Sequence, residues 1–326
     1  MRLAIGMVLL VAALFVASLL SGQAPVGAGQ SLQALVAGDG TPLSVVMREI
    51  RLPRALLAAM IGAVLGLSGA AMQGYLRNPL AEPGLIGISG AAALGAVLAI
   101  QTGLSLMFPL ALPLAALGMA VLAVLLILML AGPRGASITL ILAGIAISAL
   151  AGALISLALN LSPNPFAAAD IVFWMMGSLA DRSFTHVWLA LPFMAVGAAL
   201  LASLGRGLDA LTLGEDAAQA MGVNLTGLRL RLVLGTAACV GAATAVAGAI
   251  GFVGLVVPHL LRPAVGARPS ALLWASALGG AAMVLAADIA VRELLPARDL
   301  KLGVLMALVG APLFLHLIYK TRKEMA

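Results

Sequence analysis

Apolar residues along this chain come in long unbroken runs rather than in alternating or amphipathic patterns. A helix that crosses a bilayer needs about 20 consecutive apolar residues, whereas a transmembrane β-barrel alternates apolar and polar positions. The pattern therefore predicts an all-α, polytopic membrane protein with about ten transmembrane helices. The expected spans are 3–21, 55–73, 85–107, 109–131, 138–160, 186–204, 230–250, 252–265, 271–290 and 302–319.

Two of these runs need interpretation. The eighth is short, and Pro258 and Pro263 interrupt it. The first resembles a signal peptide, but its apolar run is long and no small-residue cleavage site follows, so we interpret it as a span. Residues 1–326 are expected to form a single transmembrane domain, within which 206–229 is the longest cytoplasmic loop.

Composition excludes the soluble and disordered classes. Only 9% of residues are charged and 63% are hydrophobic, whereas a soluble domain carries about 25% charged residues. The net charge of +6 is therefore interpreted as loop charge and not as a nucleic-acid surface. Most of the 18 Lys and Arg residues lie inside if both termini are cytoplasmic, although several arginines then lie outside.

A weak internal repeat is visible at one fixed offset. The second span runs inward and the seventh outward in the expected topology, so the repeat would be inverted, as in many transporters. A chance match between glycine-rich segments is the alternative. The aligned residues are Gly69 with Gly248, Leu76 with Leu255, and Pro79 with Pro258. The spans also contain a G-x-x-x-G pair, Gly62 and Gly66, which is typical of close helix packing.

Two segments contain residues that do not suit lipid. The segment 77–84 has two prolines, a charge pair and a glycine, so it is either a cytoplasmic turn or a broken segment lining a pathway. In the second case Asn78, Pro79 and Leu80 lie near its inner mouth. The segment 160–177 is expected to be an outer loop. Its amide, aromatic and thioether side chains suit a large amphiphilic solute, although a tryptophan is equally typical of the membrane interface. These residues are Asn164, Trp174, Met175 and Met176.

The loop 206–229 predicts a short cytoplasmic helix. Thr212 and Glu215 have the spacing of a capping box, and Gly222 is expected to end the helix. Its exposed acids and the apolar Leu213 and Met221 form either a docking surface or a solvated helix.

Catalytic and metal motifs are not found in the sequence. It contains neither a phosphate-binding G-x-x-x-x-G-K-[ST] loop nor H-E-x-x-H, its single cysteine is Cys239, and its three histidines have no local spacing typical of a metal site. Asp288 is either a proton relay or the partner of Arg292 four residues later. A proton relay at Asp288 or Asp170 would fit an ion-coupled secondary transporter, and a membrane-embedded enzyme is a further class.

Taken jointly, several motifs resemble the FecCD-type permeases, the membrane subunits of bacterial ATP-binding cassette (ABC) importers for iron–siderophores, heme and cobalamin. The resemblance extends from residue 50 to residue 312. The matching stretches are Ile50-Arg51-Leu52-Pro53-Arg54, Ser68-Gly69, Met72-Gln73, 77–84, Leu213-Gly214-Glu215, 248–259, Ala287-Asp288-Ile289, Leu302-Gly303-Val304 and Gly310-Ala311-Pro312.

The resemblance implies a multi-pass protein of the bacterial inner membrane, whose partners are a second permease copy, two ATPase subunits and a substrate-binding protein. ATP and Mg²⁺ would be used by the ATPase, and this chain would hold no cofactor or metal and contact no nucleic acid. By the same resemblance, Leu213, Gly214, Glu215 and Asp216 couple to the ATPase, and Arg51, Arg54 and Arg292 pair with acids of the binding protein. Asn78, Leu80 and Ser137 would form the inner constriction. An iron chelate is the expected substrate, with cobalamin as the alternative.

Overall fold

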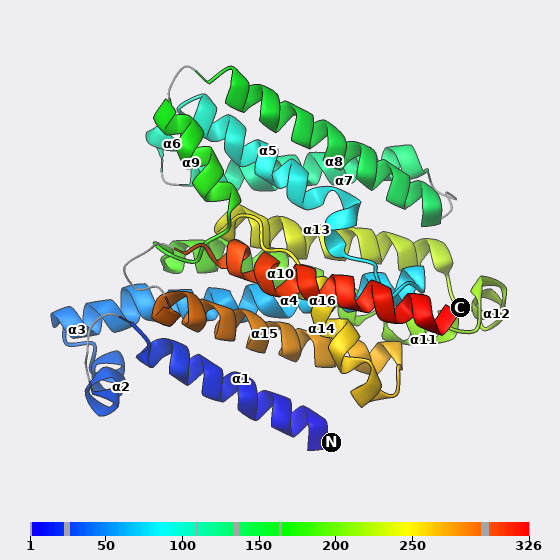
Figure 1. The fold of residues 1–326 in the computed structure, drawn as a ribbon, viewed down its shortest axis with the longest axis horizontal. Helices are drawn as coiled ribbons and strands as arrows, with labels where there is room; N and C mark the ends of the chain where they lie inside the picture. Colours follow the sequence, from blue (N-terminus) through cyan, green and yellow to red (C-terminus); the bar gives the residue numbers. More distant parts are fainter. Residues whose placement is uncertain are drawn as a thin grey trace.

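A computed structural model describes residues 2–22, 27–108, 110–132, 137–162, 165–294 and 300–325, and every regular element in these ranges is helical. The long helices run roughly side by side in one bundle, with α1 along its edge (Figure 1). Their bounds are α1 Arg2–Leu20, α2 Ala28–Ala37, α3 Pro42–Val45, η1 Val46–Arg51, α4 Leu52–Leu76, η2 Pro83–Ile86, α5 Ile88–Gln101, α6 Leu104–Met107, α7 Ala111–Ala131, α8 Ser137–Asn160, α9 Pro165–Met175, α10 Phe184–Ala202, α11 Gly205–Leu211, α12 Glu215–Ala220, α13 Leu225–Ala247, α14 Val253–Leu261, η3 Pro263–Val265, α15 Pro269–Leu294 and α16 Leu302–Met325.

Seven helices of the described residues are long and apolar enough to cross a membrane: α1, the continuous helical stretch Pro42–Leu76 that ends in α4, α7, α8, α10, α13 and α15. The run expected at 85–107 is divided into α5 and α6, because Gly103 adopts φ +71° between them. The run expected at 252–265 contains the nine residues of α14 and the three of η3, separated at Arg262. Helix α5 has 14 residues and α14 has nine, and both are shorter than the roughly 20 residues of a full span. The expected number of ten spans is therefore confirmed only approximately.

The expectation of an outer loop at 160–177 is partly wrong. Residues Pro165–Met175 form α9, an apolar helix of 11 residues. Ile171 of α9 is buried against α5 and α8, and Met175 packs against the same cluster. Burial of an apolar face therefore decides the structure of a segment whose prolines and amides suggested an irregular chain.

Close backbone contact between α4 and α15 organises the core. A Cβ atom at Gly62 would lie 2.2 Å from the carbonyl oxygen of Gly280, and one at Gly66 would lie 2.0 Å from that of Ser276. No side chain fits between the helices at these levels. The expected G-x-x-x-G packing is confirmed, and its partner is α15.

Both ends of the chain lie at one end of the bundle together with α11 and α12, whereas α2, α3, α6 and α9 lie at the other (Figure 1). The side of the membrane on which the termini lie stays a prediction. Helices α4 and α13 run in opposite directions, as an inverted repeat requires. The aligned residues do not share a local conformation, however: Gly69 lies within α4, whereas Gly248 follows the end of α13 with φ +73°.

Candidate coupling, docking and pathway sites

The loop 206–229, which is expected to be cytoplasmic, folds into two short helices, α11 and α12, that contact each other. Leu213 is 68% exposed and Met221 is 64% exposed, and the side chains of Glu215 and Asp216 in the first turn of α12 face solvent. Two acids at a helix N-terminus are favourable because of the helix dipole. The loop therefore presents a mixed apolar and acidic surface outside the bundle.

The expected capping box in this loop is wrong. Gly214 and not Thr212 precedes α12, and it has φ +104° without a side-chain cap. The Thr212 hydroxyl donates to the carbonyl oxygen of Asp209 at 2.7 Å instead. A glycine is needed at this point because the backbone turns through a conformation that other residues rarely adopt. The expected end of the helix is confirmed by Gly222, which has φ +83° directly after Met221.

What we call the outer arginine cluster consists of Arg51, Arg54 and Arg292, all expected to face outside, around the buried carboxylate of Asp288. Asp288 is 0% exposed, and its side chain accepts from the Nη2 atom of Arg54 at 2.8 Å and from that of Arg292 at 2.9 Å. The expected pairing of Asp288 with Arg292 is thus confirmed, and Arg54 is a second partner that lies 234 residues away in sequence.

The same cluster holds the end of α1. Arg292 donates to the carbonyl oxygens of Ser18 at 2.9 Å and Ser21 at 3.0 Å. Arg51 is 6% exposed and donates to the carbonyl oxygens of Leu19 at 3.0 Å and Leu20 at 3.2 Å. The two guanidinium groups satisfy carbonyls at the C-terminal end of α1.

These contacts affect how Arg51, Arg54 and Arg292 could pair with a substrate-binding protein. Arg54 and Arg292 keep side-chain exposures of 18% and 12%. Arg51 and Arg292 would both have to leave carbonyl partners at the end of α1 to reach another protein. Pairing of the three arginines with a binding protein stays a prediction.

The segment after α4 is a tight turn that returns into the bundle. Arg77 adopts φ +49° at the end of α4, and the Asn78 side chain accepts from the backbone N–H of Leu80 at 2.9 Å. Asn78 is exposed, and Pro79 and Leu80 are half-buried. The turn then leads into η2 and α5, and its role as the lining of a pathway stays a prediction.

Sequence analysis missed the contacts that tie this turn to α14. The Glu82 carboxylate accepts from the backbone N–H of Phe252 at 2.9 Å. Phe252 has φ +67°, an uncommon conformation for an aromatic residue, and its Cβ atom abuts Gly310 of α16. Buried Gln73 donates to the carbonyl oxygens of Gly254 and Leu255, at 3.3 and 3.2 Å, and accepts from Arg262 at 2.7 Å. These partners lie about 170 residues or more apart in sequence, so no local signal marks them.

The remaining pathway candidates have unequal support. Trp174 and Met175 are half-buried and pack against the apolar core, and Met176 is 37% exposed. Ser137 is the first residue of α8, but its side chain lies outside the described part of the structure, and so does Asn164.

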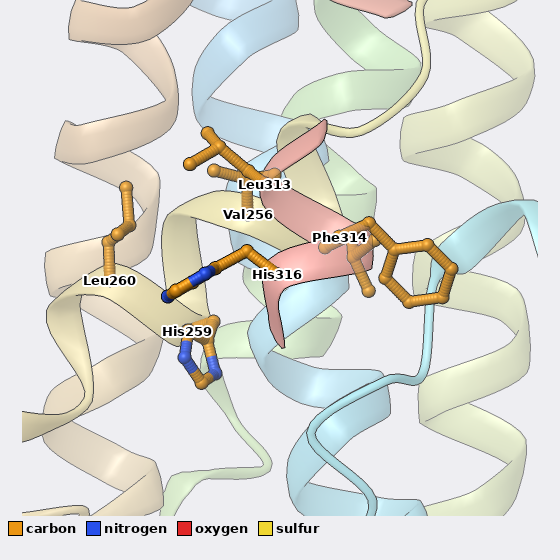
Figure 2. Close-up of a pocket in the computed structure, with 7 residues that line it drawn as sticks. Val256, His259, Leu260, Leu313, Phe314 and His316 are labelled. Atoms are coloured by element: carbon orange, nitrogen blue, oxygen red, sulfur yellow. The ribbon is translucent and has the colours of Figure 1, made fainter. Parts of the chain in front are cut away.

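A cavity of about 210 Å³ lies between α14 and α16, lined mainly by apolar side chains. It brings together two of the three histidines, His259 and His316, which project from the two helices toward the same space (Figure 2). Two imidazoles do not complete a zinc shell, which needs three or four ligands. The described residues contain no cluster of three or more metal-ligating side chains.

Comparison with known proteins gives a consistent result over almost the whole chain. The model of the FecCD transport family matches residues 9–320. The ABC transporter permease protein YvrB of Bacillus subtilis is 36% identical over 90% of this chain and 84% of its own. The hemin transport permease HmuU of Yersinia pestis is 39% identical over 85% and 84%. The vitamin B12 import permease BtuC of Vibrio cholerae is 40% identical over 83% and 82%.

Solved structures agree with these relatives. A structure described as an inward-facing conformation of a metal-chelate type ABC transporter is 34% identical, with a TM-score of 0.87 over 98% of this chain and 99% of that one. PsaBC from Streptococcus pneumoniae, 18% identical with a TM-score of 0.54 over 88% and 94%, shares the fold. The family match, the relatives and the apolar helix bundle therefore agree that this chain belongs to the FecCD transport family, as a multi-pass permease of the ABC importer class.

Proposed function

We propose that this protein is the permease subunit of a binding-protein-dependent importer that carries an iron chelate, a ferric siderophore or heme, across the bacterial inner membrane. The observation that carries the proposal is the match of 98% of the chain, at 34% identity, to a transporter described as metal-chelate type. The 39% identity to a hemin permease supports the same substrate class.

In this proposal the permease works as a pair of copies. Two ATPase subunits dock at the end of the bundle that carries α11 and α12, and a substrate-binding protein docks at the opposite end. ATP and Mg²⁺ are used by the ATPase, and this chain contributes no cofactor. The exposed Leu213 and the acids Glu215 and Asp216 support a contact there, because an apolar anchor within a charged rim is typical of protein interfaces.

The translocation pathway is proposed to pass the turn 77–84, where Asn78, Pro79, Leu80 and the start of α8 at Ser137 form the inner constriction. The exposed Asn78 and the irregular backbone of this turn support the assignment, since such backbone at membrane depth is tolerated only within protein or beside a cavity. Asn164, Trp174, Met175 and Met176 are proposed to line the outer part.

At the outer end, Arg54 and Arg292 are the proposed contacts for acidic residues of the binding protein, with Arg51 behind them. These three arginines face Asp288 and, at longer range, Glu293, which leaves one positive charge in excess near the surface. Charged rims of this kind mainly orient two proteins and speed their encounter.

Cobalamin is the second candidate substrate. The permease of a vitamin B12 importer is 40% identical to this chain, close to the 39% of the hemin permease, so identity alone does not separate them. A proton-coupled transporter is not favoured, because Asp288 is paired with two arginines.

The deciding experiment is a ligand screen with the complete importer in lipid nanodiscs, including its binding protein. Ferric siderophores, heme and cobalamin are titrated by calorimetry, and ATP-driven uptake into liposomes is measured for each. Tight binding and uptake of a ferric chelate or heme supports the proposal. Uptake of cobalamin alone replaces it with the second candidate, and uptake driven by a proton gradient without ATP excludes both.

Coupling through α12 is tested separately. Glu215→Lys is expected to leave the complex assembled and to reduce ATP-driven uptake. Gln219→Lys, at an exposed position of the same helix, is the matched control and should retain it. Normal uptake by the assembled Glu215→Lys complex contradicts the coupling assignment.

A further inference from the structure

The cytoplasmic loop is attached to one particular helix of the bundle. Asp209, on α11, accepts a hydrogen bond from the backbone N–H of Ser270 at 2.8 Å, one from the Ser270 hydroxyl at 2.7 Å, and one from the Nε atom of Arg268 at 2.9 Å. Ser270 is in the first turn of α15, where backbone N–H groups have no partner within the helix. A carboxylate of one segment therefore caps the helix of another, which lies beside it at the same end of the bundle (Figure 1).

Charge strengthens this attachment. Burial by itself would raise the pKa of the Asp209 carboxyl, but the hydrogen bonds from Ser270 and Arg268 outweigh it, so the pKa lies below its ordinary value. Asp209 is thus ionised at neutral pH and faces the positive end of the α15 dipole. The Arg268 side chain is 71% exposed, so its ion pair is screened by solvent, and the two bonds to Ser270 are the main part of the contact.

Helix α15 reaches the outer arginine cluster. Its 26 residues extend from Pro269 to Leu294, a length of about 39 Å at about 1.5 Å per residue. Asp288 near its far end pairs with Arg54 and Arg292. Between these ends, α15 touches α4 backbone to backbone at Gly62 and Gly66. Because the two backbones pack this closely, we expect α4 and α15 to move together.

We propose that Asp209 is the positioning residue through which the cytoplasmic loop moves α15, and with α15 the outer arginine cluster. A displacement of α11 and α12 by the ATPase would pull the N-terminus of α15 through Ser270, and α4 and α15 together would carry that displacement to the surface that meets the binding protein. This inference deepens the proposed function and rests on its assignment of 206–229 as the coupling loop.

The test compares three variants in the reconstituted importer. Asp209→Ala removes all three hydrogen bonds, Ser270→Ala removes only the hydroxyl bond, and Arg206→Ala alters an exposed residue of the same helix as a control. The ATPase rate is measured with and without the substrate-loaded binding protein. We expect Asp209→Ala to keep the unstimulated rate and to lose about tenfold in stimulation, which is about 1.4 kcal/mol of coupling. Ser270→Ala should lose less, and Arg206→Ala should match the unaltered protein.

A second readout tests whether Asp209 transmits motion along α15 or only attaches the loop to this helix. A spin label at Glu293→Cys, an exposed position at the outer end of α15, reports the distance between the two copies after the buried Cys239 is replaced by Ala. ATP should change this distance in the otherwise unaltered protein and should not change it in Asp209→Ala. If Asp209→Ala does not assemble, Asp209→Asn, which keeps one acceptor oxygen, takes its place with a partial loss expected.

Two outcomes separate the role of Asp209 from the assignment of 206–229 as the coupling loop. If Glu215→Lys abolishes stimulation but Asp209→Ala retains both stimulation and the ATP-dependent distance change, only the role of Asp209 is overturned. If neither variant alters stimulation, the assignment of the coupling loop is wrong and the inference falls with it.

Discussion

Replacing Asp288 by Asn is the most direct probe of the outer arginine cluster. The side chains have nearly the same shape, so the substitution removes charge and one acceptor without opening a cavity. Arg54 and Arg292 would then lose the carboxylate that both contact at 2.8–2.9 Å, and the buried Arg51 lies nearby. The described residues show no second carboxylate within ion-pair distance of these arginines.

The size of the effect follows from burial. Removing one partner of a buried ion pair costs about 3–5 kcal/mol, because the other charge remains without compensation. Arg54 and Arg292 keep 18% and 12% exposure, so the lower end of the range, about 3 kcal/mol, is expected. That is roughly a hundredfold change in the ratio of folded to unfolded protein.

Thermal unfolding of the detergent-solubilised permease, followed by size-exclusion fluorescence, measures this loss. Arg268→Gln breaks the exposed pair with Asp209 and should cost about 0–1 kcal/mol, which makes it the matched control. A double variant, Asp288→Asn with Arg54→Gln, should recover part of the loss because it removes one excess charge. Unchanged unfolding of Asp288→Asn would refute the reasoning, and unchanged unfolding with abolished uptake would favour a proton relay instead.

Three further predictions test other parts of the structure. Gly62→Leu should prevent close approach of α4 and α15 and reduce the yield of folded protein, whereas Gly118→Leu on α7, where a Cβ meets nothing within 4 Å, should not. Glu82→Ala should cost about 1–3 kcal/mol and reduce uptake, because the N–H of Phe252 loses its partner, while Glu82→Gln should retain most uptake; equal uptake by both would contradict this. Because the pKa of Asp209 is lowered, its stabilising contribution is complete above about pH 4 and lost as pH falls through the lowered value. The difference in unfolding temperature between the unaltered protein and Asp209→Asn should therefore be constant from neutral pH to about pH 5 and shrink only in stronger acid; a difference that shrinks near neutral pH would oppose it.

The pattern of neighbouring residues was sufficient to predict the helices, several of their ends and one ion pair within a helix. Long apolar runs predicted helices because a helix satisfies its own backbone hydrogen bonds in lipid. The prolines of 77–84 marked the break after α4, Gly222 marked the end of α12, and the spacing of Asp288 and Arg292 predicted their pair.

Where a short segment has weak local preference, packing reversed the expectation. The segment after α8 forms α9 because Ile171 and Met175 meet an apolar cluster of α5 and α8. At α12 the capping pattern pointed to Thr212, but the chain turns at Gly214 and the hydroxyl bonds back to Asp209.

The sequence by itself determined that this chain spans the membrane as helices and belongs with the FecCD permeases, because hydropathy and short motifs are properties of contiguous residues. Tertiary structure alone decided which distant groups meet: Arg54 with Asp288, Glu82 with Phe252, and Asp209 with Ser270. Each pair joins residues about 60 to 230 positions apart, and their contact depends on helix packing that no local pattern encodes.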